Sequence, residues 1–105
     1  MGIGMQIVYL GFAGAARIEA EAAVQFVRLE RFGDRISGCH LAIEAMHSKS
    51  GPVYDARLDL VTRDGELVPL PHCADADPEK AIRAAFDRAV EALADRGDSE
   101  AQPGT

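Results

Sequence analysis

The chain has 105 residues, of which 48% are hydrophobic and 27% charged, with 11 basic and 17 acidic side chains and a net charge of −6. This length is typical of one domain, and the composition excludes collagen-like and wholly disordered chains. No apolar run reaches the roughly 18 residues that a membrane span needs. The acidic balance argues against a protein whose whole surface holds nucleic acid, although it allows a local basic patch.

The cysteines and the N-terminal segment bear on the cellular compartment. Cys39 and Cys73 are the two cysteines, whereas small secreted domains usually carry four or more, paired in disulfides. We therefore expect free thiols in a reducing cytoplasm. Residues 4–16 are mostly apolar, but no Lys or Arg precedes them, and a signal peptide needs a positive region there. A first strand followed by a glycine-rich turn fits these residues better.

The first half of the chain predicts a strand, a helix and a second strand. Residues 5–10 combine Ile, Val and Tyr between glycines, which predicts a strand, and Gly11 and Gly14 then interrupt the chain. Apolar side chains recur at three- and four-residue steps over residues 15–32, which predicts a helix. Residues 36–46 alternate apolar and polar side chains, the pattern of a strand with one solvated face.

Two further strands are predicted after this point. Residues 47–52 are polar and predict a loop, and residues 53–62 alternate again. Asp64 and Gly65 are typical of a hairpin turn. We expect a short strand over residues 66–70, and its prolines restrict it to a sheet edge.

The last third of the chain predicts a loop, a helix and a tail. Residues 71–76 predict the loop, and Asp77, followed by a proline, predicts the start of a helix that runs to about Arg96. We expect a single domain over residues 1–97 and a disordered tail over residues 98–105.

The element order is therefore β-α-β-β-β-α. Each strand has one apolar face and each helix one apolar stripe, so the simplest fold is an α+β two-layer sandwich, with both helices on one face of a four-stranded sheet. The last three strands should form an antiparallel meander. The first strand should run parallel to a neighbour, because a helical crossover follows it.

The histidines and cysteines raise the question of a metal site. Cys39-His40 and His72-Cys73 pair the residue types that zinc prefers. However, neighbouring residues on a strand point to opposite faces, and the sequence contains neither Cys-x-x-Cys nor His-x-x-x-His spacing. We therefore expect a buried Cys39, a surface His40, and no metal or other cofactor.

No catalytic motif stands out. The chain lacks a nucleophile elbow, a P-loop and a glycine-rich dinucleotide loop after a strand. Asp55 and Asp59 share one face of a predicted strand, which is compatible with acid–base chemistry. A solvated strand face with cross-strand ion pairs is the favoured interpretation. We expect no catalytic residues and no enzyme activity.

Basic side chains gather on the two predicted helices and just after the first. If the helices lie side by side, these side chains could form one basic strip. The residues concerned are Arg17, Arg28, Arg31, Arg35, Lys80, Arg83 and Arg88. The competing interpretation, which the net charge favours, is a solvated face of ion pairs. The carboxylates available for such pairs are Glu21, Asp87, Glu91 and Asp95.

Several segments match, in order, the motifs of a known family. Residues 29–32 (LERF) resemble "K-L-E-[KR]-[FW]", and residues 36–47 (ISGCHLAIEAMH) are similar to "I-x-x-C-R-V-x-V-E-x-P-H". Residues 54–60 (YDARLDL) resemble "Y-x-V-R-I-D-L", residues 64–68 (DGELV) resemble "G-G-E-L-V", and residues 81–87 (AIRAAFD) resemble "A-I-R-D-A-F-D". As an ordered set covering nearly the whole chain, they resemble the ribosome hibernation promoting factor family, which includes ribosome-associated inhibitor A.

The resemblance implies a non-catalytic cytoplasmic stress factor that binds the small ribosomal subunit in the mRNA and tRNA channel and inhibits translation. It implies salt-dependent contacts between rRNA phosphates and basic side chains on both helices. Carried onto this chain, the rRNA-binding residues would be Arg17, Arg28, Arg31, Arg35, Lys80, Arg83, Arg88 and Arg96. We expect no DNA or membrane partner, and a monomer or weak homodimer.

The chain also departs from the family pattern. His40 stands where the family usually carries Arg, and histidine is charged only part of the time near neutral pH. Val90 and Glu91 occupy two positions of the last helix that are often basic. These departures predict a weaker affinity for the ribosome and leave the expected fold unchanged.

Two other functions stay open from the sequence. A non-ribosomal binding module on the same fold would pair with a protein through its acidic surface or an exposed sheet edge. A small enzyme or metal protein would be built around His40, His72 and the cysteines. Salt-sensitive RNA binding that is lost on Arg28→Glu and Arg31→Glu would separate the ribosomal function from both, and zinc analysis would test the last.

Overall fold

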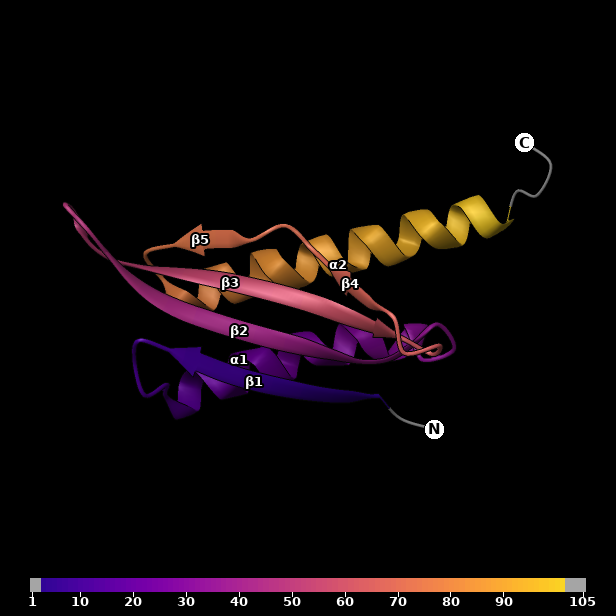
Figure 1. Cartoon of the computed structure of the whole chain (residues 1–105), viewed down its shortest axis with the longest axis horizontal. Coiled ribbons are helices and arrows are strands. Elements are labelled where there is room, and N and C mark those ends of the chain that lie inside the picture. Colours follow the sequence, from indigo (N-terminus) through magenta and orange to yellow (C-terminus); the bar gives the residue numbers. More distant parts are fainter. Residues whose placement is uncertain (1–2, 102–105) are drawn as a thin grey trace.

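The protein is a two-layer α+β sandwich in which two helices cover one face of a five-stranded sheet (Figure 1). The structure, a computed structural model, describes residues 3–101, with side chains described for residues 3–95. The elements are β1 (Gly4–Leu10), α1 (Ala16–Phe26), the 3₁₀ segment η1 (Val27–Phe32), β2 (Ile36–Ser48), β3 (Gly51–Thr62), β4 (Leu67–Pro69), β5 (Cys73–Asp75) and α2 (Pro78–Ala101). The predicted fold class is confirmed, with one strand more than expected.

The sheet has the predicted topology. Its order is β1-β2-β3-β4, and β5 also pairs with β3. Strand β1 runs parallel to β2, as the helical crossover between them requires. Strands β2, β3 and β4 form the antiparallel meander. None of the helices in the described residues is long and apolar enough to cross a membrane.

The core forms where the inward side chains of the strands meet the apolar stripes of the helices. In the central pair of strands, Cys39 lies opposite Leu60 and Leu41 opposite Leu58, and all four side chains are buried. The helices bury Ile18, Ala22, Leu29, Ile82, Phe86 and Leu93 against them. This arrangement follows the predicted alternation of the strands and the three- and four-residue steps of the helices.

A tight turn between β1 and α1 sets the position of the first helix. Gly14 has a φ of +82°, a conformation that side chains with a Cβ rarely adopt. A Cβ on Gly14 would lie 2.7 Å from the ring of Tyr9. The glycine is therefore required both by the backbone conformation and by the packing of Tyr9 beneath the turn.

The first helix changes type near its end. The sequence predicts one helix to Phe32, but the α-helix stops at Phe26 and continues as 3₁₀. Leu29 and Phe32 are both buried and lie three residues apart. A 3₁₀ helix has three residues per turn and puts such a pair on the same face, so burial of both side chains accounts for the tighter winding.

The predicted loop at residues 47–52 is wrong, because β2 and β3 continue into it. Pairing extends to Ser48 opposite Gly51, which leaves a two-residue turn. Gly51 has a φ of +118°, and the Ser48 hydroxyl donates to the Gly51 carbonyl at 2.7 Å. Both faces of this end of the hairpin are largely exposed, so its polar composition concealed the strands.

A second correction concerns residues 71–76, predicted as a loop, where Cys73–Asp75 forms β5. The Leu70 amide donates to the Leu58 carbonyl at 3.3 Å, whereas Cys73 lies opposite Ala56. Pro71 and His72 therefore both lie opposite Arg57. Two residues opposite one is the geometry of a β-bulge. The prolines around the bulge are typical of a loop, so the sequence pattern did not indicate the strand that resumes after them.

The end of α2 is the third correction. The sequence predicts a stop at about Arg96, but the helix runs to Ala101. A glycine inside a helix costs about 1 kcal/mol relative to alanine and does not by itself end the helix. The next strong break in the sequence is Pro103, since the residue before a proline disfavours the helical conformation. Residues 102–105 of the predicted disordered tail lie outside the described residues.

Candidate nucleic-acid interface

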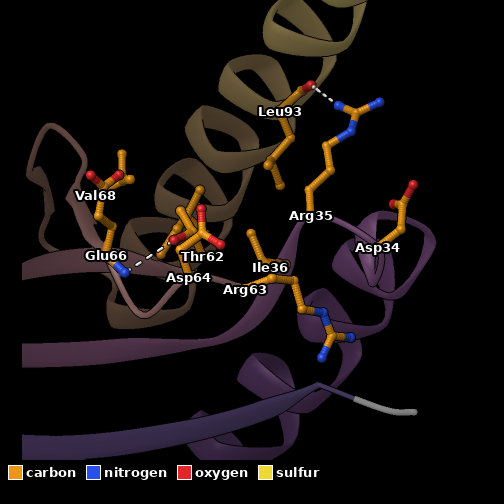
Figure 2. Close-up of a pocket in the computed structure, with 10 residues that line it drawn as sticks. Asp34, Arg35, Ile36, Thr62, Arg63, Asp64, Glu66, Val68 and Leu93 are labelled. Atoms are coloured by element: carbon orange, nitrogen blue, oxygen red, sulfur yellow. Dashed lines mark hydrogen bonds between the residues drawn. The ribbon is translucent and has the colours of Figure 1, made fainter.

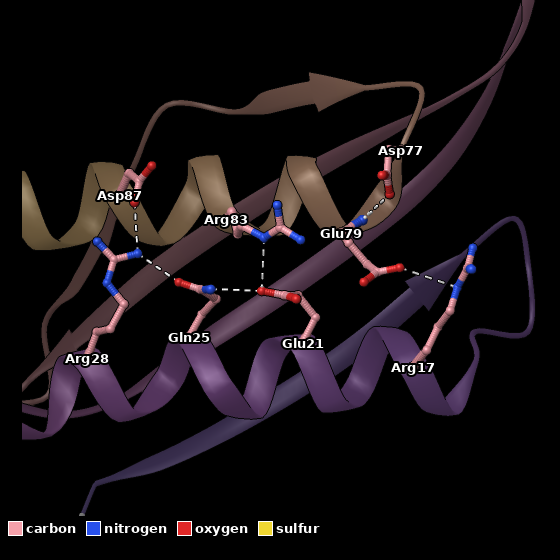
Figure 3. Close-up of polar contacts among 8 residues, drawn as sticks. All are labelled: Arg17, Glu21, Gln25, Arg28, Asp77, Glu79, Arg83 and Asp87. Atoms are coloured by element: carbon pink, nitrogen blue, oxygen red, sulfur yellow. Dashed lines mark hydrogen bonds and ion pairs between the residues drawn. The ribbon is translucent and has the colours of Figure 1, made fainter.

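The two helices run side by side in the same direction, and a row of ion pairs joins them (Figure 3). Arg17 of α1 contacts Glu79 of α2, with Nε and Oε2 3.4 Å apart. The next two pairs along the row are Glu21–Arg83 at 3.2 Å and Arg28–Asp87 at 2.8 Å. We call these three pairs the ion-pair ladder. Each joins a base on one helix to an acid on the other.

Gln25 links two steps of the ladder. Its side-chain amide donates to Glu21 Oε2 and its oxygen accepts from Arg28, both at 2.7 Å. The hydrogen bond from Gln25 is the main cause that lowers the pKa of Glu21 below its ordinary value of 4.5, and Arg83 adds to the effect while burial opposes it. Gln25 is buried, so a polar residue on the apolar stripe of α1 finds its partners within the ladder.

The ladder also bears on the electrostatic repulsion between the two helix dipoles. Parallel neighbouring helices place like ends of their macrodipoles together, and charged side chains near a helix end can compensate for this. Glu79 lies in the first turn of α2 and faces the N-terminal end of that helix dipole. Arg17, by contrast, is a cation in the first turn of α1, where the helix dipole disfavours positive charge. Its pair with Glu79 offsets that unfavourable interaction.

The remaining basic residues lie outside the ladder. The Arg31 guanidinium stacks over the Phe32 ring, 4.7 Å from its centroid, and Lys80 is exposed. Arg88 lies 3.9 Å from Glu91 on the same helix. Arg35 donates to the Leu93 carbonyl at 2.7 Å. The side chain of Arg96, also predicted to bind rRNA, lies outside the described residues.

Arg35 lies at the rim of a cavity of about 510 Å³ between α2 and the turn that joins β3 to β4 (Figure 2). Arg63, on the same rim, donates to the Gly33 carbonyl at 2.8 Å. Both guanidiniums thus already hold backbone carbonyls. The carboxylates that line the cavity are Asp34, Asp64 and Glu66. They outnumber the two guanidiniums, so the cavity is poorly suited to phosphate.

The structure therefore brings three predicted rRNA-binding residues, Arg17, Arg28 and Arg83, into one row between the helices and pairs each with an acid. The competing interpretation of the sequence, a solvated face of ion pairs, describes the geometry of Glu21, Asp87 and Glu91 correctly. Asp95 makes no ion pair within the described residues. The assignment of these bases to RNA stays a prediction.

The open face of the sheet holds the histidines considered as metal ligands. Cys39 is buried in the core and His40 is exposed, so the two point to opposite faces as strand alternation predicted. Burial raises the pKa of the Cys39 thiol to about 12. Among the described residues, no three His, Cys, Asp or Glu side chains are placed to share a metal ion.

Two contacts on this face were not predicted from the sequence. His72 Nδ1 lies 2.9 Å from Asp55 Oδ2 across the β-bulge. Asp59 is only 8% exposed, and its nearest cation is Arg57, with Nε and Oδ2 3.7 Å apart. No spacing in the sequence indicates the His72–Asp55 contact, because it depends on a bulge between segments 17 residues apart.

Comparison with known proteins shows what this fold resembles. A ribosomal subunit interface protein from Coxiella burnetii matches with a TM-score of 0.68 and 16% identity, over 91% of this chain and 99% of that one. The N-terminal domain of Protein Y from Thermus thermophilus matches with a TM-score of 0.67 and 20% identity, over 89% and 96%. This chain shares their fold. No protein-family model and no curated protein sequence matches it.

Both solved structures belong to the hibernation promoting factor family, which the sequence motifs resemble. The resemblance is therefore confirmed at the level of the fold. It extends over nearly the whole of both compared chains. The two helices and their basic side chains thus lie on the same framework as in a ribosomal subunit interface protein.

Proposed function

We propose that this protein is a non-catalytic, ribosome-associated factor that binds the rRNA of the small subunit and inhibits translation in the cytoplasm. The observation that carries the proposal is the fold shared with a ribosomal subunit interface protein over 91% of the chain. The ordered sequence motifs point to the same family. The basic side chains of the helix layer supply the chemistry for phosphate contacts.

Binding by this surface requires an exchange of partners. The guanidiniums of Arg17, Arg28 and Arg83 hold carboxylates in the ladder, and a phosphate would compete with those carboxylates. Exposed ion pairs contribute only about 0–1 kcal/mol, so a phosphate can displace them. Arg31 and Lys80 hold no carboxylate within the described residues and would bind first.

Occupation of the subunit by such a factor accounts for inhibition without catalysis. A protein bound in the mRNA and tRNA channel excludes both ligands by occupying their space. Release then depends on salt, because each phosphate contact liberates condensed counterions. In this proposal the protein acts as a monomer or weak homodimer, with no DNA or membrane partner.

Co-sedimentation with ribosomes in sucrose gradients, at low and at physiological salt, tests the proposal. We expect the protein in the small-subunit or monosome fraction at low salt, with partial release as the salt rises. Addition of the protein to a cell-free translation reaction should lower the yield. Protein that stays at the top of the gradient at low salt would overturn the proposal and favour a non-ribosomal binding module.

A matched pair of variants makes the test specific for the helix layer. Arg31→Gln and Arg57→Gln each remove one positive charge, from the helix layer and from the open face of the sheet respectively. We expect Arg31→Gln to shift the protein toward the top of the gradient and Arg57→Gln to leave its position unchanged. Equal shifts would indicate a response to net charge instead of a defined surface.

A further inference from the structure

The hairpin formed by β2 and β3 extends past the rest of the sheet (Figure 1). Pairing of β1 with β2 ends at Leu10 opposite Glu44, and pairing of β5 with β3 ends at Tyr54 opposite Asp75. Beyond these points, within the part of the chain that the structure describes, β2 and β3 pair only with each other. We call residues 45–53 the hairpin arm. At about 3.3 Å per residue, its tip lies about 13 Å beyond the last flanking strand.

The tip of the arm has a defined turn. The Ser48 hydroxyl donates to the Gly51 carbonyl at 2.7 Å and lies 3.3 Å from the Ser50 hydroxyl. Gly51 takes the left-handed conformation that the turn requires. Lys49 therefore stands at the end of a short, hydrogen-bonded ribbon with exposed side chains on both faces.

The charge of the arm is opposite to that of the molecule. His47 and Lys49 are the ionisable residues of the arm, and both are basic, while the whole chain has a net charge of −6. Within the described residues neither makes an ion pair. The nearest carboxylates in the sequence, Glu44 and Asp55, lie at the base of the arm.

We propose that the hairpin arm binds the phosphate and sugar backbone of structured RNA. This inference rests on the proposed function and adds a second contact surface, separate from the helix layer. Lys49 supplies the cation for a phosphate, and the Ser50 hydroxyl can donate to a phosphate oxygen. The Ser48 oxygen, whose proton is donated to the Gly51 carbonyl, can accept from a 2′-hydroxyl. Phosphates and 2′-hydroxyls of the RNA are exposed along the wide, shallow minor groove of an RNA helix.

The composition of the arm favours RNA over an acidic protein and predicts little sequence selectivity. The arm carries no Phe, Tyr or Trp, and His47 is its one ring on which a base could stack, whereas single-stranded RNA is usually read by stacking several bases. Protein interfaces usually centre on buried aromatic or apolar anchors, whereas the only large apolar side chain exposed on the arm is Met46, which is 39% exposed. Backbone contacts position a protein without reading the sequence.

Directed cleavage from the tip tests the placement of the arm. Iron–EDTA is attached to a cysteine at Ser50→Cys in a Cys73→Ser background, where the remaining Cys39 is buried and unreactive. The matched control carries the label at Glu66→Cys, in the exposed turn at the opposite end of β3. We expect rRNA cleavage from position 50 that the control does not reproduce. Cleavage of a ribosomal protein from position 50 without rRNA cleavage would overturn the assignment to RNA.

A charge variant tests the energetic contribution. Lys49→Gln and Leu67→Glu each lower the net charge by one, at opposite ends of β3. We expect Lys49→Gln to weaken ribosome binding about fivefold at low salt and to reduce the salt slope by about 0.7–0.9. Leu67→Glu should match the unmodified protein.

The outcomes separate the arm from the proposed function. If the unmodified protein co-sediments and Lys49→Gln binds equally well, the arm proposal fails while the ribosomal function stands. If the unmodified protein does not co-sediment, the ribosomal function fails. Fluorescence anisotropy with a short RNA duplex then tests the arm proposal by itself. Duplex binding that is equal for the unmodified protein and Lys49→Gln overturns that proposal.

Discussion

The helix layer and the hairpin arm carry positive charge in opposite ways. The helix layer holds many bases, but Arg17, Arg28 and Arg83 each share their charge with a carboxylate on the facing helix. The arm holds only His47 and Lys49, and no acid lies beside them along residues 45–53. The positive charge available to a partner depends on which side chains face each other. The arm holds fewer bases than the helix layer, but nearby carboxylates offset a smaller share of its positive charge.

We expect the ion-pair ladder to weaken phosphate binding by the helix layer without preventing it. Its members are partly exposed, with side-chain exposure of 40% for Arg28 and 57% for Asp87, and such pairs are individually weak. A guanidinium also has five N–H donors and can contact a carboxylate and a phosphate together. We therefore expect the acids of the ladder to lower the affinity for RNA and to make its salt dependence shallower.

Removal of the three ladder acids should have the largest effect. In Glu21→Gln/Glu79→Gln/Asp87→Asn the three arginines keep their charge and lose their competitors. We expect ribosome binding about 100-fold tighter at physiological salt, with a salt slope steeper by up to about 2.7 if all three contact phosphates. Quantitative co-sedimentation over a salt series measures both quantities.

The control for this variant raises the net charge equally at positions outside the ladder. The substitutions are Glu30→Gln, Asp64→Asn and Glu66→Gln, all at exposed positions. We expect less than a tenth of the gain seen for the ladder variant. An equal gain would mean that net charge, and not the ladder, limits binding.

A comparison of two neighbouring arginines gives the next largest effect. Arg31 stacks on Phe32 and has no carboxylate partner in the described residues, whereas Arg28 contacts Asp87. We expect Arg31→Gln to weaken ribosome binding about tenfold and Arg28→Gln about twofold, because Asp87 already offsets the charge of Arg28. The reverse order would show that the ladder does not compete with RNA.

Acidification should change the contribution of Glu21 to stability. Its folded-state pKa is lowered, chiefly by the hydrogen bond from Gln25, so the ionised carboxylate stabilises the fold above its ordinary pKa of 4.5. That contribution is lost as the pH falls through the lowered folded-state pKa. We expect Glu21→Gln to be less stable than the unmodified protein at about pH 6, and the difference to become smaller at about pH 3.

Urea unfolding at the two pH values measures this difference, and Glu30→Gln provides the comparison. Glu30 is exposed and makes no ion pair in the described residues. Its substitution should leave stability nearly unchanged at both pH values. A stability difference for Glu21→Gln that is undiminished at the lower pH would contradict the role of the ionised carboxylate.

The smallest expected effects concern the stability contributed by single pairs. A double-mutant cycle of Arg28→Ala and Asp87→Ala should give a coupling of at most about 1 kcal/mol, and a cycle on Arg88 and Glu91 about 0–0.5 kcal/mol. The first pair bridges two helices at 2.8 Å, while the second lies within one helix at 3.9 Å. A coupling of several kcal/mol across Arg28 and Asp87 would make the ladder a structural element and not a competitor for phosphate.

The fold could be predicted because it depends on local patterns that agree with one another. Alternation around Leu41 and Leu58 indicated strands, and the steps from Ile82 to Phe86 indicated a helix. Strand β5 was missed because prolines and a bulge interrupt the pattern before Cys73. The ends of β2 and β3 were missed because a ribbon exposed on both faces shows no apolar alternation.

The candidate site could be predicted only as a list of bases. The sequence indicated that Arg28 lies on a helix and that an acid would pair with it, but Arg28 and Asp87 are 59 residues apart. Their contact depends on the direction and spacing of two helices on a sheet. Gln25, which links the ladder, carried no signal beyond a polar residue on an apolar stripe.

The two-layer fold, its strand directions and the family resemblance could all be read from the sequence, because periodicity, turn residues and ordered motifs are properties of neighbouring residues. Which charges remain available to a partner depends instead on how the elements pack against one another. Charge compensation acts through space between side chains that packing brings together. It paired Arg17, Arg28 and Arg83 with carboxylates, while it left Lys49 without a carboxylate partner among the described residues.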